Sequence, residues 1–141
     1  MPPTNAPNED IGYTDTGRVE DKSLDEVSGC VASRVNEGIL WIHNDGDDNT
    51  LSAIRTSGET VARLELPVRT DDVEDVAITP KTNDRPASLY LADVGDNKRK
   101  RDRVRIFRTP EPVLDLDRAS KHQTIHCASL EVFAVSYPDR K

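Results

Sequence analysis

A series of four short strand-like segments occurs near the start of the chain and then begins again, which limits the folds open to this sequence. The first series covers residues 26–33, 38–44, 51–56 and 60–66. Short apolar or alternating runs separated by Gly, Asn, Asp, Ser and Pro residues are typical of β-strands joined by tight turns. Helical periodicity is weak throughout, apart from one candidate turn near residues 116–121. The sequence therefore predicts an all-β fold.

The second series repeats the first in order and in detail. It covers residues 73–79, 88–92, 104–109 and 128–137. Tyr90 stands where Trp41 stands, and residues 107–109 (Phe-Arg-Thr) correspond to residues 54–56 (Ile-Arg-Thr). The offset between equivalent segments drifts from about 46 to about 53 residues, which is the range of propeller blades rather than of shorter solenoid repeats. Four short strands per unit at this period are typical of a β-propeller blade.

We therefore predict two consecutive four-stranded antiparallel β-propeller blades, which together form an incomplete propeller. The predicted organisation is a flexible N-terminal segment (1–16), a first blade with a preceding closing strand (17–70), a second blade (71–138) and a tail (139–141). The alternative is a β-sandwich, in which the two strand series would play unrelated roles.

Several stretches resemble the opening two blades of a bacterial β-propeller family. They are residues 24–29 (LDEVSG), 40–45 (LWIHND), 73–77 (VEDVA), 89–97 (LYLADVGDN) and 105–112 (RIFRTPEP). The family is distantly similar to regucalcin, gluconolactonase and the esterase-like phytase propellers. The resemblance implies a larger, exported protein whose further blades complete the ring. It also implies a divalent cation held by channel-facing Glu and Asn side chains.

Two blades are too few to close a ring, because propellers typically have four to eight blades. The expected partners are therefore the missing propeller blades, as for a fragment of a larger protein, or further copies of the chain assembled head to tail. The N-terminus, Met-Pro-Pro-Thr-Asn-Ala-Pro, has neither a basic nor an apolar region, so no secretory signal is predicted. By that criterion alone the chain is cytoplasmic, whereas the family resemblance implies an extracytoplasmic protein.

Oxygen-bearing side chains lie near the ends of the strands that would line the channel of a completed propeller. They are Glu26, Asn44, Asp45, Glu74, Asp75, Asp93, Asp96 and Asn97. Oxygen ligands that converge on one place suit Ca²⁺, which takes six to eight of them. We therefore take these residues as candidate Ca²⁺ ligands in a completed ring. The alternative is that Asp and Asn at these positions simply make turns.

Three classes of function are open on this sequence. The first is a propeller section of unknown ligand that binds Ca²⁺ when the ring is complete. The second is a cation-dependent hydrolase of the lactonase or phosphoester type, in which the cation polarises a carbonyl or activates water. The third is a carbohydrate- or protein-binding ring formed by oligomerisation. The sequence has no G-x-S-x-G stretch to support α/β-hydrolase chemistry, and the chain alone is not expected to be an enzyme.

The net charge argues against nucleic-acid and membrane partners. The chain has 26 acidic and 19 basic residues and a formal charge of −7, which opposes attraction to polyanions. The basic cluster at residues 97–103 has no aromatic side chain for base stacking, so we interpret it as a solvated loop. No apolar run approaches the ~18 residues of a membrane span. Cys30 and Cys127 are expected to be free thiols, buried or half-buried.

Overall fold

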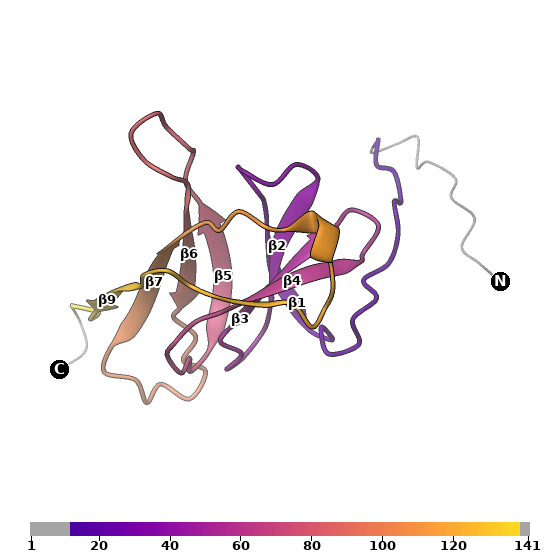
Figure 1. Ribbon diagram of the computed structural model, residues 1–141. Helices are drawn as coiled ribbons and strands as arrows, with labels where there is room; N and C mark the ends of the chain where they lie inside the picture. Colours follow the sequence, from indigo (N-terminus) through magenta and orange to yellow (C-terminus); the bar gives the residue numbers. More distant parts are fainter. Residues whose placement is uncertain (1–11, 139–141) are drawn as a thin grey trace.

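Two open β-sheets make up the regular structure of residues 12–138, which are the residues that the computed structural model describes (Figure 1). The all-β prediction is confirmed, because these residues contain no α-helix and one 3-10 turn, η1 (Leu116–Arg118). Residues 1–11 of the predicted flexible segment and the predicted tail, 139–141, lie outside the described residues.

The first sheet contains the first series of strands in chain order. Its members are β1 (Val27–Ala32), β2 (Ile39–Asn44), β3 (Thr50–Arg55), β4 (Thr60–Glu65) and β8 (Thr124–His126). Neighbouring strands from β1 to β4 are antiparallel, whereas β8 comes from much later in the chain and pairs parallel to β4 at the sheet edge. This pairing was not predicted, because nothing in a three-residue segment indicates its partner strand.

The second sheet contains the second series of strands. Its members are β5 (Val73–Ile78), β6 (Ser88–Asp93), β7 (Val104–Pro110) and β9 (Glu131–Val135), and all its pairings are antiparallel. The predicted strands are therefore present, with β9 shorter at both ends than the predicted 128–137. Between β7 and β9 the chain leaves this sheet, passes through η1 and β8, and then returns (Figure 1).

The two sheets share a local irregularity at the same place. β1 carries a register shift between Val27 and Gly29, and β5 carries one between Val73 and Asp75. A bulge of this kind bends a strand and increases its local twist. The sequence repeat therefore corresponds to a repeat in backbone geometry, including the bend at the start of each first strand.

The apolar core lies between the two sheets, which approach each other most closely at β1, β2 and β5. Its largest buried side chains are Trp41 from β2 and Phe107 from β7. The indole nitrogen of Trp41 donates a hydrogen bond of 2.8 Å to Oε1 of Glu111, which is itself buried. The polar edge of the largest aromatic side chain is thus satisfied inside the core, as buried polar groups normally are.

The outer face of the first sheet is covered by the segment that precedes β1. At one end of the sheet, the backbone N–H of Glu20 donates to the carbonyl of Gly58 at 3.1 Å. At the other end, Nδ2 of Asn44 donates to the carbonyl of Ser23 at 2.7 Å. Ile42, which alternates with the core-facing Trp41 along β2, is consequently buried on this outer face. The predicted closing strand is not formed within this covering segment, since residues 14–20 have no regular secondary structure.

Two smaller expectations have different outcomes. Cys30 and Cys127 are both free thiols, as predicted, and Cys127 is half-buried. Cys30 is exposed, which corrects the expected burial, because β1 is an edge strand and Cys30 points away from the core. Within residues 12–138, no helix has the length and apolar character needed to cross a membrane.

Candidate functional site

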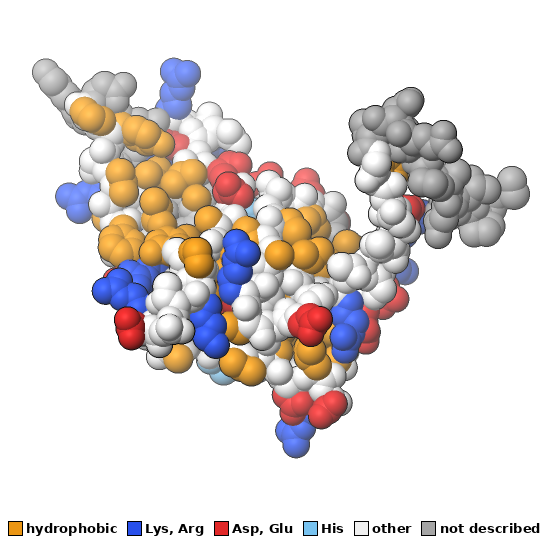
Figure 2. Space-filling model, turned by 90° about the horizontal axis from the view of Figure 1, so that it is seen from above, with side chains coloured by type: hydrophobic (Ala, Val, Ile, Leu, Met, Phe, Trp, Pro, Cys, Tyr) orange, Lys and Arg blue, Asp and Glu red, His pale blue; other side chains and the backbone are white. Residues whose placement is uncertain are grey.

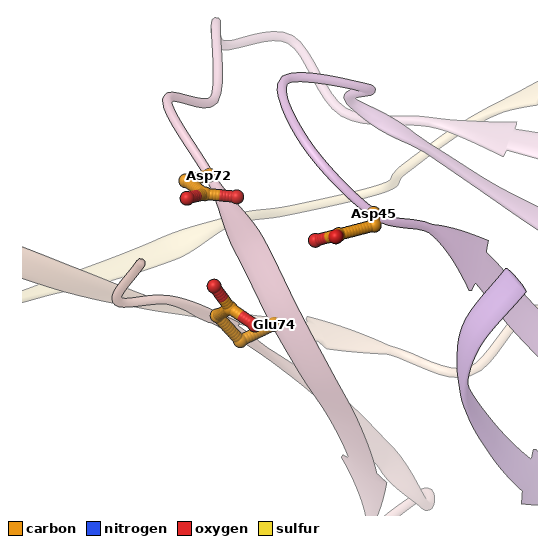
Figure 3. Close-up of side chains that lie close together, drawn as sticks. All are labelled: Asp45, Asp72 and Glu74. Atoms are coloured by element: carbon orange, nitrogen blue, oxygen red, sulfur yellow. The ribbon is translucent and has the colours of Figure 1, made fainter. Parts of the chain in front are cut away.

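Three carboxylates from the two repeats converge at one end of the sheets. Asp45 follows β2, Asp72 immediately precedes β5, and Glu74 lies in β5. One carboxylate oxygen from each residue lies within 4.8 Å of the corresponding oxygens of the other two. Figure 3 shows the three side chains pointing toward a common space between the β2 end and the start of β5. Two of the eight predicted ligands, Asp45 and Glu74, are therefore brought together.

Backbone hydrogen bonds hold the two repeats together at this point. The N–H of Val73 donates to the carbonyl of Gly46 at 2.7 Å and forms an isolated bridge between the β2–β3 loop and β5. Gly46 has a φ of 100°, a conformation that side chains other than glycine rarely adopt. The N–H of Asp45 donates to the carbonyl of Glu26 at 2.8 Å. Asp45 is therefore positioned by the backbones of both repeats.

Gly95 leaves the space in which two of the carboxylates lie. A Cβ atom at Gly95 would overlap the carboxyl group of Asp72 and lie 2.5 Å from Oε1 of Glu74. The N–H of Gly95 also donates to the carbonyl of Asp72 at 3.0 Å. A glycine here permits a close approach of side chains to the backbone. The Val-Gly-Asp stretch after β6 thus has a structural role at the acidic cluster, defined as Asp45, Asp72 and Glu74.

The electrostatics of the acidic cluster favour a bound proton or cation. Burial raises the pKa of Asp72, and the charges of Asp45 and Asp93 raise it further. Burial likewise raises the pKa of Glu74, with additional increases from the neighbouring Asp72 and Asp45. The charge of Arg101 lowers the pKa of Asp72, and that of His43 lowers the pKa of Glu74, but in both groups the causes that raise the pKa prevail. Like charges held together in this way are relieved by protonation or by a cation.

Asp93 lies behind the cluster and is paired with arginine. Its side chain is completely buried and accepts hydrogen bonds from Arg101 at 3.0 Å and Arg105 at 2.7 Å. The backbone N–H groups of Asp72 and Asp71 also donate to it, at 2.8 and 3.2 Å. Burial raises the pKa of Asp93, but these backbone hydrogen bonds and the arginine charges outweigh burial and lower it. The structure thus places Asp93 as an anchor for the strand that carries the cluster.

Asn44 and Glu26 lie beside the cluster and bond to each other. The Oδ1 atom of Asn44 accepts the backbone N–H of Glu26 at 3.2 Å, and the side chain of Glu26 is exposed. Asp75 follows Glu74 in the β5 bulge and accepts the N–H of Val76 at 2.8 Å. Neither Glu26 nor Asp75 belongs to the group of three carboxylates, and the Asn44 amide is bonded to the segment before β1.

Asp96 and Asn97 lie in the loop between β6 and β7. The carboxylate of Asp96 accepts the backbone N–H of Lys100 at 2.8 Å and that of Arg101 at 3.2 Å, and the side chain of Asn97 is exposed. For Asp96 this is the turn-making role that was the alternative to metal binding. The basic loop is more than a solvated segment, because Arg101 folds back onto Asp93.

Asp72 was missed in the sequence, although the repeat contained the signal. When the first residues of β1 and β5 are aligned, Asp72 stands at the position of Glu26, which is a candidate ligand in the sequence. Asp72 lies in a loop just before a strand, where Asp ordinarily indicates a turn. Compared with known proteins, the chain matches no family model, no curated protein and no solved structure.

Proposed function

We propose that this chain is a two-blade section of a β-propeller whose acidic cluster binds a divalent cation, with Ca²⁺ as the expected ion. The convergence of Asp45, Asp72 and Glu74 from two successive repeats carries the cation proposal. Three carboxylates supply part of the oxygen shell that Ca²⁺ prefers, and water or further blades supply the rest. In the proposed propeller the first strand of each blade would line the channel, and the cluster, which lies beside the first strand of the second sheet, would face that channel.

The propeller architecture is supported by the direction in which equivalent side chains point. Trp41 of the first sheet points into the core, toward the second sheet. Tyr90, its equivalent in β6, lies on the opposite side of its own sheet from the buried Leu89 and Leu91. Successive blades present the same face in the same direction around a ring. In a sandwich, by contrast, the two sheets would turn equivalent faces toward each other. Equivalent side chains of the two sheets would then meet in the core.

Calcium binding to the intact metal-free chain tests the cation proposal. We expect a saturable heat in isothermal titration calorimetry and a rise in the melting temperature at excess Ca²⁺, because a ligand of the folded state stabilises it. Asp72→Asn and Glu74→Gln remove one charge each with little change in shape. Each is expected to weaken binding about tenfold or more, equivalent to about 1.4 kcal/mol.

Asp75→Asn is the matched control, because Asp75 neighbours Glu74 in sequence and has its carboxylate on the β5 bulge rather than in the cluster. This variant should bind Ca²⁺ with unchanged affinity. Equal weakening by all three variants would indicate a general effect of net charge and contradict a defined site. Absence of any heat at millimolar Ca²⁺ would also exclude the site in this chain.

A further inference from the structure

The outer face of the second sheet is an open apolar surface. Tyr90, Ala92 and Ile106 line a shallow hollow on this face together with residues of β5. Phe133 of β9 pairs with Ile106 and is 42% exposed. Figure 2 shows hydrophobic side chains gathered on the left of the view, over the part of the molecule that holds the second sheet in Figure 1. A contiguous exposed apolar patch with a polar border is typical of a binding surface.

This open face repeats a face that is already occupied elsewhere in the molecule. Position by position, Tyr90 and Ala92 correspond to Trp41 and His43 of the first sheet. Trp41 and His43 are both completely buried, because the second sheet packs over their face. The side chains of the second sheet that do so are Val76, Leu89, Leu91 and Phe107. The same face is therefore covered by a neighbouring sheet in the first sheet and left uncovered in the second sheet.

We infer that the open face binds a further four-stranded antiparallel sheet, which offers a row of Val, Leu and Phe side chains as the second sheet does to the first. This inference rests on the proposed propeller architecture and identifies its next partner. The free edge of β9 fits the same arrangement. In the first sheet the corresponding edge strand, β4, receives β8 as a parallel partner, whereas β9 has no second neighbour among the described strands.

A polar border surrounds the apolar centre of the open face. Arg108 lies over the ring of Tyr90, 5.9 Å from its centroid, and forms an ion pair of 3.7 Å with Glu131. These residues also line a hollow of about 540 Å³ that includes Pro86 and Pro110. An apolar centre with a polar, partly paired rim is the usual anatomy of a protein–protein interface.

A second copy of the chain is not the occupant that the structure favours. In a head-to-tail ring, the open face of one copy would meet the outer face of the next copy's first sheet. That face is covered by the segment that precedes β1, which is held by the Asp21–Arg63 ion pair and by the hydrogen bond from Glu20 to Gly58. Ring assembly of copies would have to displace this segment.

A tandem protein tests the inference with the full chain intact. It consists of the 141-residue chain followed directly by a second copy of residues 71–138, which supplies a further sheet and its own β8 segment. We expect a monomer with one unfolding transition. In this protein, Ala92→Arg in the first copy should lower the melting temperature by about 4 °C or more, because the arginine would be forced into the new interface.

The same Ala92→Arg change in the 141-residue chain should leave the melting temperature within about 1 °C, because its side chain then reaches solvent. Ala32→Arg, at an exposed alanine at the end of β1, is the matched control and should affect neither protein. Equal effects of Ala92→Arg in both proteins, or separate unfolding of the added sheet, would overturn the inference. So would a dimer of the 141-residue chain, seen by light scattering, that Ala92→Arg abolishes.

Calcium titration of the tandem protein separates this inference from the cation proposal. If the tandem protein does not bind calcium but Ala92→Arg still lowers its melting temperature, the result counts against the metal site alone. If the tandem protein binds calcium but Ala92→Arg does not lower its melting temperature, the result counts against the open face as a binding surface alone.

Discussion

Asn44 and Asp93 occupy the same position in the two sheets and make the same bond. Each is the last residue of the second strand of its sheet, and each accepts a backbone N–H from the segment before the first strand. Asn44 accepts from Glu26 at 3.2 Å, and Asp93 accepts from Asp72 at 2.8 Å. The second sheet uses a carboxylate because Arg101 and the neighbouring Arg105 surround it.

Asp93→Asn should therefore destabilise the protein even though it copies the residue of the first sheet. The amide keeps an acceptor for the backbone of Asp72 but leaves Arg101 and Arg105 without their buried counter-charge. Asp71 remains within ion-pair distance of both arginines and compensates in part, so we expect a loss of about 2 kcal/mol, below the ~3–5 kcal/mol of a broken buried ion pair. Urea unfolding at pH 7 measures the loss, and the reverse change, Asn44→Asp, shows whether a carboxylate without arginines is tolerated. Equal stability of Asp93→Asn and the parent chain would contradict this role.

The Asp21–Arg63 pair should make stability depend on pH in the acid range. Burial raises the pKa of Asp21, but hydrogen bonds from Ser23 and Arg63 outweigh burial and lower it to about 2. Because the folded-state pKa lies below the unfolded value, the contribution is complete above about pH 5 and is lost as the pH falls toward 2. It amounts to about 2 kcal/mol for a shift of this size. Urea unfolding between pH 7 and pH 2 should show it, and Asp21→Asn should flatten this part of the curve.

Gly95→Ala should weaken cation binding without changing the charge of the acidic cluster. The new methyl group would displace the carboxylates of Asp72 and Glu74, which are flexible enough to move aside while the fold persists. We expect calcium affinity to fall about tenfold, or about 1.4 kcal/mol. Calorimetry measures the affinity, and circular dichroism checks the fold. Ser28→Ala is the control, because Ser28 holds the bulge position in β1 that Glu74 holds in β5. Unchanged affinity in Gly95→Ala would show that the cluster does not bind the ion.

Gly29→Ala should destabilise the contact between the first strands of the two sheets. A Cβ at Gly29 would lie 2.5 Å from Nε2 of His43 and 3.1 Å from Cγ1 of Val76. His43 is completely buried, and its Nδ1 lies 2.8 Å from the carbonyl of Asn44, so its ring has little room to move. Overpacking of this kind costs about 1–3 kcal/mol. Thermal unfolding should show a lower midpoint, and a smaller effect of Gly29→Ala in a His43→Ala background than in the parent chain would confirm the steric cause.

The strands and their repetition could be predicted from the sequence because both are local properties. Alternating or apolar runs between turn residues marked every strand from β1 to β7, and the Trp41–Tyr90 equivalence aligned the two units. The partner of β8 could not be predicted, since the pairing of residues 124–126 with β4 depends on the path of the chain after β7. Pairing between distant segments leaves no local pattern.

The candidate site was only partly predictable for a related reason. The acidic residues near strand ends include the cluster members Asp45 and Glu74, but they also include Asp93 and Asp96, which accept hydrogen bonds from Arg101 and from the backbone of a turn. Whether an acid binds a metal, pairs with arginine or caps a turn depends on which donors the fold brings to it. Arg101 reaches Asp93 from a basic loop whose composition alone indicates a solvated segment.

The excursion of the chain to β8 interlocks the two halves of the molecule. The second sheet receives its last strand, β9, after residues of the same connection have joined the edge of the first sheet. The connection after β7 therefore joins the second half of the chain to the edge of the first sheet. Separation of the two halves would leave the first sheet without β8 at its edge, so we expect the two sheets to unfold together.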